Sequence, residues 1–189
     1  YLGPNNYGLI NYVGSYIAFF TSICTLGLEG IIIKELLENP LEEGRILGSG
    51  IFLRILSSFV SSIAIVVIIY LLNPDDIFIV TIAILQSISL VFRSFELIDF
   101  WYQSKLKSKY TTIIKISSYL VMSAYKVIIL ILHKDVRWFA FSTSLDIIVA
   151  SGLMYYFYRK HSGPKLRINK LTCISLIRQS YHFIFSGLM

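Results

Sequence analysis

The chain has 189 residues, of which 56% are hydrophobic and 15% are charged, and its mean hydropathy is +0.70. A soluble domain carries about a quarter charged residues, and here the apolar residues lie in blocks of roughly 20, the length that crosses a bilayer. Composition therefore excludes a soluble globular domain, a disordered chain and a secreted disulfide scaffold. It predicts an integral membrane protein.

The net charge of +6 results from 17 basic and 11 acidic residues. Because the basic residues lie between the apolar blocks, this excess favours cytoplasmic loops, and we expect no nucleic-acid partner. Cys24 and Cys173 are far apart and have neither a disulfide framework nor zinc-ligand spacing. Since the common hydrolase, metalloprotease and nucleotide-binding motifs are also missing, we expect no enzyme, no metal and no cofactor.

Five apolar blocks are long enough to span a membrane, and we expect them to be helices because unpaired backbone groups are costly in hydrocarbon. The predicted fold class is therefore all-α, a polytopic helical membrane protein. The predicted spans are residues 9–33, 46–72, 77–103, 111–132 and 138–158, with a further span that starts near residue 181. Because the chain starts without Met and ends inside an apolar run, we expect it to be a piece of a longer protein.

The segments between the spans alternate in charge. One set carries two basic residues and the other carries eleven, so the positive-inside rule places the second set in the cytoplasm. The eleven are Lys34, Arg45, Lys105, Lys107, Lys109, Arg159, Lys160, Lys165, Arg167, Lys170 and Arg178.

Eight charged residues lie inside the predicted spans, where each costs about 2.5–3.5 kcal/mol at a helix centre and usually faces a cavity or a partner. The four basic ones, candidates for substrate binding, are Arg54, Arg93, Lys115 and Lys126. The four acidic ones, candidates for ion coupling, are Glu29, Glu96, Asp99 and Asp146. Helical geometry places polar residues of the first four spans on one face each: Asn11, Ser15, Ser22 and Glu29; Gly50, Arg54, Ser57, Ser58 and Ser61; Gln86, Ser89, Arg93, Glu96 and Gln103; Lys115, Ser118, Tyr119, Met122 and Lys126.

Several of these charges have structural alternatives. Lys115 and Lys126 lie within about two turns of a span end, so their ammonium groups can reach the interface. Arg93 and Glu96 are spaced for a local i,i+3 ion pair. For these four residues, a structural role and a role in substrate binding or ion coupling both remain open.

The remaining charges differ in depth. Glu29 lies near the cytoplasmic end of its span, where it can pair with Lys34, and Asp99 lies close to a span boundary, as expected for an interfacial residue. Arg54 and Asp146 are more than about 10 Å from either end at 1.5 Å per residue. These two are therefore the strongest functional candidates.

A path lined by several cations suits an anionic substrate. Arginine is always protonated and binds two phosphate oxygens at once. Buried acids can take up a proton or a sodium ion, as in secondary transporters. The charges therefore favour a transporter and leave its substrate open.

Four stretches resemble the polysaccharide-exporter branch of the MATE-like multidrug/oligosaccharidyl-lipid/polysaccharide superfamily, the O-antigen or repeat-unit flippases. They are YLGPNNYG at 1–8, LGLEGIIIKEL at 26–36, GSGIFLRILSS at 48–58 and FELIDFWYQSKLKSKY at 95–110. The resemblance covers nearly the whole chain and implies a lobe of six helices, one of two around a cavity that opens to one side at a time. Residues 1–189 would be a truncated N-terminal lobe.

The resemblance also implies a function. The family moves an undecaprenyl-diphosphate-linked oligosaccharide across the bacterial inner membrane by alternating access, for O-antigen or capsule biosynthesis. Arg54 matches the family's intramembrane arginine, and Glu96 and Asp99 fall in its acidic run in the fourth helix; Lys126 and Asp146 have no match. The implied partners are the lipid-linked substrate, membrane lipid, a coupling proton or sodium ion, and polysaccharide assembly proteins.

Two other functions remain open. A cation-coupled multidrug antiporter of the same fold would favour an acidic cavity lining, whereas the candidates here are balanced or basic. A membrane-embedded polysaccharide polymerase would need a large extracytoplasmic loop or a carboxylate cluster, and the predicted loops on that side have only a few residues.

The charge bias makes a topology prediction. The test uses a background without Cys24 and Cys173 and an impermeant maleimide applied to whole cells. The reagent is expected to label Asp75→Cys, which lies in a predicted outer loop, and not Lys107→Cys, which lies in a predicted cytoplasmic one. The opposite pattern would reverse the orientation.

Overall fold

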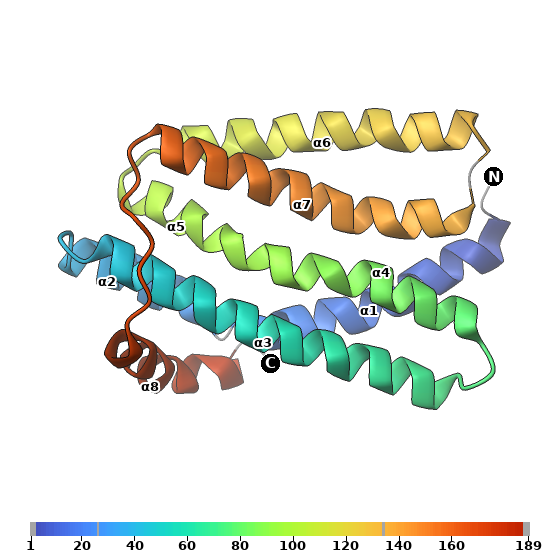
Figure 1. The fold of residues 1–189 in the computed structure, drawn as a ribbon, viewed down its shortest axis with the longest axis horizontal. Helices are drawn as coiled ribbons and strands as arrows, with labels where there is room; N and C mark the ends of the chain where they lie inside the picture. The colour runs from blue at the N-terminus through green and yellow to red at the C-terminus, as the bar shows by residue number, and fades with distance from the viewer. Residues whose placement is uncertain (1–2, 26, 134, 187–189) are drawn as a thin grey trace.

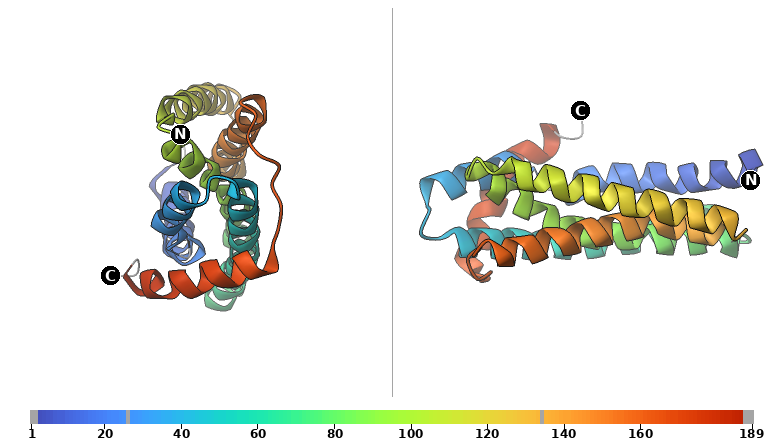
Figure 2. Two further views of the ribbon diagram at one scale, coloured as in Figure 1. Left: turned by 90° about the vertical axis from the view of Figure 1, so that its left-hand side faces the viewer. Right: turned by 90° about the horizontal axis from the view of Figure 1, so that it is seen from above.

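The computed structural model describes residues 3–25, 27–133 and 135–186, with backbone alone for 3–5 and 181–186. Helices α1 to α7 lie side by side in an elongated bundle, and α8 crosses one end of it (Figures 1 and 2). The elements in these ranges are α1 (Gly3–Cys24), α2 (Leu28–Glu38), α3 (Glu43–Leu72), α4 (Ile77–Arg93), η1 (Ser94–Glu96), α5 (Leu97–Ser104), α6 (Ser108–Ile131), α7 (Val136–Lys160) and α8 (Lys170–Ser186).

Five segments are long and apolar enough to cross a membrane. They are Asn6–Glu38, Glu43–Leu72, Ile77–Ser104, Ser108–Ile131 and Val136–Lys160. The predicted all-α, polytopic fold is therefore confirmed. The further span expected from about residue 181 falls on the end of α8, where side chains lie outside the described residues, so that span stays a prediction.

The first span consists of two helices. α1 ends at Cys24, α2 begins at Leu28, and Gly27 between them has φ 60°. Side chains disfavour this left-handed conformation and glycine adopts it freely, so Gly27 permits the break. Glu29 lies in the first turn of α2, where a negative charge stabilises the exposed N–H groups of the helix start.

The third span is interrupted by the 3₁₀ turn η1, which lies between α4 and α5. A 3₁₀ turn has 3.0 residues per turn where an α-helix has 3.6, so it rotates the residues after it relative to a straight helix. Asp99, three residues after this turn ends at Glu96, is buried, with 8% of its surface exposed.

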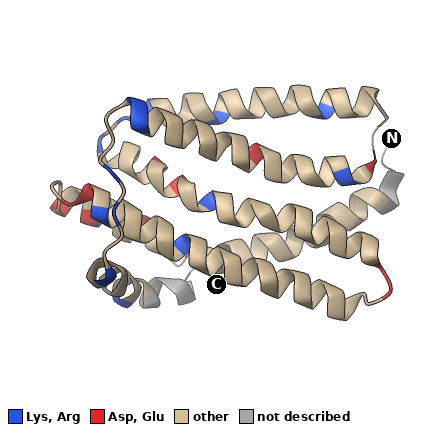
Figure 3. Ribbon diagram, in the orientation of Figure 1, with Lys and Arg blue, Asp and Glu red and all other residues tan. Residues whose placement is uncertain are grey.

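The connections gather at the two ends of the bundle. The segments 39–42, 105–107 and 161–169 lie at one end and the turn 73–76 at the other (Figure 1). Most Lys and Arg residues lie at the first end, with few charges along the helices (Figure 3). The two sets of connections defined by the charge bias are therefore separated in space.

Serine hydroxyls join the helices within the bundle. Ser144 of α7 donates to the carbonyl of Leu85 in α4, and Ser151 of α7 donates to the carbonyl of Phe92 at 2.8 Å. Small polar residues of this kind allow helices to approach closely in membranes and add hydrogen bonds between them.

Residues 163–169, which we call the strap, run from α7 to α8 across the first half of α3. The Arg167 N–H donates to the carbonyl of Gly44 at 2.9 Å, and the Asn169 N–H donates to Ser49 Oγ at 3.1 Å. A Cβ added at Gly48 would overlap the carbonyl oxygen of Arg167 and lie 2.6 Å from its nitrogen. The strap therefore needs glycine at that position.

This close approach predicts a stability effect. Gly48→Ala is expected to destabilise the protein by about 1–3 kcal/mol, because the strap must move away from α3. The matched control is Gly152→Ala in α7, whose Cβ would meet nothing within 4 Å and which should be neutral or stabilising by about 0.5–1 kcal/mol. Unfolding in mixed detergent micelles measures both, and equal effects would contradict the contact.

Candidate functional site

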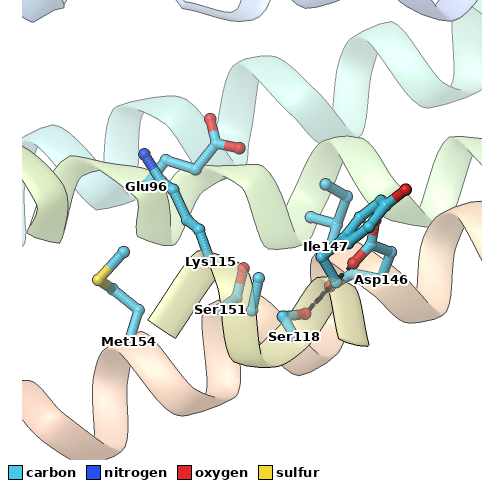
Figure 4. A pocket seen from close by; sticks show the side chains of 9 residues that line it. Glu96, Lys115, Ser118, Asp146, Ile147, Ser151 and Met154 are labelled. Atoms are coloured by element: carbon cyan, nitrogen blue, oxygen red, sulfur yellow. Dashed lines mark hydrogen bonds between the residues drawn. The ribbon is translucent and has the colours of Figure 1, made fainter. Parts of the chain in front are cut away.

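A cavity of about 250 Å³ lies between η1, α6 and α7. Glu96 and Lys115 extend into it from η1 and α6, and Ser118 and Asp146 lie on its other side (Figure 4). The full lining is Glu96, Lys115, Ser118, Tyr119, Asp146, Ile147, Ala150, Ser151 and Met154. Three of the eight charged candidates therefore line one cavity.

Lys115 connects this cavity to a fourth candidate. Its ammonium nitrogen lies 2.5 Å from Oδ2 of Asp99. The Lys115 side chain is 57% exposed and that of Asp99 is 11% exposed, so the lysine holds a buried carboxylate from the cavity side. Asp99 is thus buried within the protein and has a cationic partner, and its predicted position near the membrane interface stays a prediction.

Asp146 has a weaker partner. Its Oδ1 accepts a hydrogen bond from Ser118 Oγ at 3.2 Å, and its backbone carbonyl lies at the same distance from that hydroxyl. No Lys or Arg among the described residues lies within 4.0 Å of this carboxylate. Ser118 is therefore the one side-chain partner that the described residues give this carboxylate.

Arg54 is buried in the interior and does not line the cavity. It stands on α3 with 3% of its surface exposed, and its Nη1 has no hydrogen-bond partner in the described part of the chain. The charges that act on it are those of Glu96 and Glu29, which attract it, and of Arg93, which repels it. Arg93 Nε is likewise buried without a partner.

These positions bear on the structural alternatives. Arg93 and Glu96 form no ion pair within 4.0 Å, and Lys34 pairs with Glu38 at 3.8 Å rather than with Glu29. The i,i+3 pair and the Glu29–Lys34 pair are therefore absent from this arrangement. Glu29 itself is exposed.

Four of the eight candidates thus belong to one cluster: Glu96, Lys115 and Asp146 line the cavity, and Asp99 contacts Lys115. Arg54 lies outside the cavity lining and is acted on by the charges of Glu96, Glu29 and Arg93. Lys126 does not line the cavity; it follows Lys115 by eleven residues, about 16 Å along α6.

The sequence reasoning missed the contribution of α7 apart from Asp146. Ser151 lines the cavity, and its seven-residue spacing from Ser144 places both serines on one helix face. This spacing in the sequence could have predicted a polar face on α7. In the described residues, no group of three or more His, Cys, Asp or Glu side chains could hold a metal ion.

A family model described as "Polysaccharide biosynthesis protein" matches residues 1–189. The chain belongs to this family. No curated protein and no solved structure matches the chain. Family membership and five candidate spans together describe a multi-pass membrane protein related to polysaccharide export, and they favour a polysaccharide function over a drug antiporter.

The Lys115–Asp99 contact predicts an energetic coupling. In a double-mutant cycle with Lys115→Gln and Asp99→Asn, the two effects on the free energy of unfolding are expected to be non-additive by about 1 kcal/mol, since each change alone removes the same contact. Lys126→Gln is the control, because it should add to Asp99→Asn without coupling. Additive effects for both pairs would contradict the ion pair.

Proposed function

We propose that this chain is part of a flippase that moves an undecaprenyl-diphosphate-linked oligosaccharide across the bacterial inner membrane by alternating access, in the biosynthesis of O-antigen or capsule. Membership in the polysaccharide biosynthesis family supports an oligosaccharide as the cargo. The basic residues of the interior support a cargo that carries negative charge. On this proposal the chain acts as a transporter, not an enzyme, and polysaccharide assembly proteins are its partners.

The observation that carries the proposal is the buried, incompletely bonded guanidinium of Arg54. Removing a charge from water is expensive unless it gains a partner and hydrogen bonds. A diphosphate supplies both, because its oxygens accept the paired N–H groups of arginine. On this proposal Arg93, whose Nε also lacks a partner in the described chain, binds the second phosphate.

Glu96 gives this site a second state. It attracts Arg54 and lines the cavity beside Lys115, so it competes with an arriving anion for the same cations. Protonation of Glu96, or its capture of a sodium ion, would release Arg54 to the diphosphate. Asp146 and Asp99 are further carboxylates at which a coupling ion could bind, and Lys115 and Lys126 are further cations for the substrate.

The first test is removal of the guanidinium. In the full-length protein, Arg54→Ala is expected to abolish or sharply reduce surface polysaccharide, because a hydrogen bond to a charged group is worth about 1.5–3 kcal/mol. Arg54→Lys should retain part of the activity, since the charge persists without the bidentate geometry. Surface polysaccharide is measured at native expression.

Arg159→Ala is the control for this test, because Arg159 is exposed at the end of α7. It should leave surface polysaccharide unchanged. Normal polysaccharide with Arg54→Ala at a matched membrane level would refute the role of Arg54.

The second test separates Arg93 from Glu96. Because the two side chains form no ion pair, the exchange Arg93→Glu with Glu96→Arg is expected to give an inserted but inactive protein. A structural pair would tolerate the exchange. Substantial surface polysaccharide from the exchanged variant, at a matched membrane level, would contradict separate roles.

A further inference from the structure

The strap and α8 form a second charged surface, away from the cavity and at the end of the bundle that carries the basic connections (Figure 3). A polar hollow of about 440 Å³ lies where the strap crosses the start of α3. Arg45, Lys165 and Arg167 line it, with Glu42 as its one acidic lining residue. The function proposed above assigns no role to this hollow, and none of the eight charged candidates lines it.

The positive charge of the hollow is only partly neutralised. Arg45 Nη1 lies 2.9 Å from Glu42 Oε1, so one of the three cations has a counter-charge. The side chains of Lys165 and Arg167 form no ion pair with any acid in the described part of the chain. Three cations against one acid leave a net charge of +2 in one hollow.

The backbone holds these cations in place. The strap is fastened to α3 by the Arg167–Gly44 and Asn169–Ser49 hydrogen bonds, and no side chain separates the two at Gly44 or Gly48. Lys165 and Arg167 are alternate residues of this extended segment. Their charges are therefore kept close together although they repel each other, an arrangement that an anion would stabilise.

α8 continues from the strap as an amphipathic helix that crosses the end of the bundle (Figure 2, left). Cys173 and Leu176 are buried against the bundle, with 8% and 1% of their surface exposed. Leu171, Ile174 and Ile177 are 77%, 54% and 47% exposed, and Ile174 is about 200° from Leu176 around the helix axis. α8 thus buries Cys173 and Leu176 against the bundle and carries a second apolar row, Leu171, Ile174 and Ile177, that has little cover in the described chain.

Further apolar side chains are exposed on the strap and beside the hollow. Ile168, next in the chain to Arg167, is 63% exposed, and Leu41, which lines the hollow, is 99% exposed. Exposed apolar side chains beside unneutralised cations are the features of a segment that lies in the membrane interface, with its apolar residues at the acyl boundary and its cations at the headgroups. Each Lys or Arg near an anionic surface adds about 1 kcal/mol to such binding.

We propose that the strap and α8 form a binding site for an anionic phospholipid, with the headgroup phosphate in the hollow against Lys165 and Arg167 and the acyl chains along Leu171 and Ile174. Charge complementarity selects this occupant over a zwitterionic lipid, and the apolar row selects it over free phosphate. The site would fasten this end of the bundle to the cytoplasmic leaflet.

The binding test uses the full-length protein in nanodiscs that contain phosphatidylglycerol and phosphatidylcholine, with retained lipid counted by native mass spectrometry. Wild type should retain phosphatidylglycerol in preference. Lys165→Gln with Arg167→Gln should weaken that retention about 30-fold, from two cations at about a tenfold factor per 1.4 kcal/mol. The control, Lys107→Gln with Lys109→Gln, removes the same charge from exposed residues at the same end and should have no effect.

A second measurement locates the apolar row. A fluorophore at Ile174→Cys, on a Cys24→Ser and Cys173→Ser background, should be quenched more by brominated phosphatidylglycerol than by brominated phosphatidylcholine. Equal retention by the two charge variants, displacement of the lipid by inorganic phosphate, or a label at position 174 that no lipid quenches because protein covers it would each overturn the proposal.

Discussion

The hydrocarbon core of a bilayer offers no hydrogen-bond partner to the peptide backbone, so a spanning chain must satisfy its own N–H and C=O groups. Helices satisfy this condition, and the 3₁₀ turn η1, which interrupts the third span, packs against α3 and α7. Serine hydroxyls such as those of Ser144 and Ser151 then use the remaining lone pairs of helix carbonyls. The bundle, its breaks and its polar contacts all follow from that one condition.

The same low dielectric makes the interior charges depend on one another. A single charge there is costly, but opposite charges in proximity reduce the cost. Here Glu96 attracts Arg54 of α3 and lines the same cavity as Lys115 of α6. The balance is incomplete, because Arg54 Nη1 and Arg93 Nε lack partners in the described chain. These two donors are the unpaired cationic groups on which the proposed binding of a diphosphate rests.

The two ends of the bundle have different physical tasks. At the basic end, Glu43 is buried and accepts hydrogen bonds from Trp101 at 2.7 Å and from Lys105, and the strap closes over α3 beside it. At the other end, the turn at residues 73–76 is short and Asp76 caps α4 by accepting from the N–H groups of Phe78 and Ile79. The end that carries most of the basic residues is thus also the end that the strap covers.

The sequence by itself determined the membrane class and the presence of five spans, because block length depends only on distance along the chain. Helical periodicity also placed Gln86 and Ser89 on an interior face, and both are buried. It could not foresee the break at Gly27 or the turn η1, which rotate everything that follows. Only the tertiary structure decided that Lys115 holds Asp99, that Lys126 lies apart, and that Arg93 and Glu96 do not pair. The partners of a charge are set by the packing of separate helices, and distances between helices are not encoded in the period of any one of them.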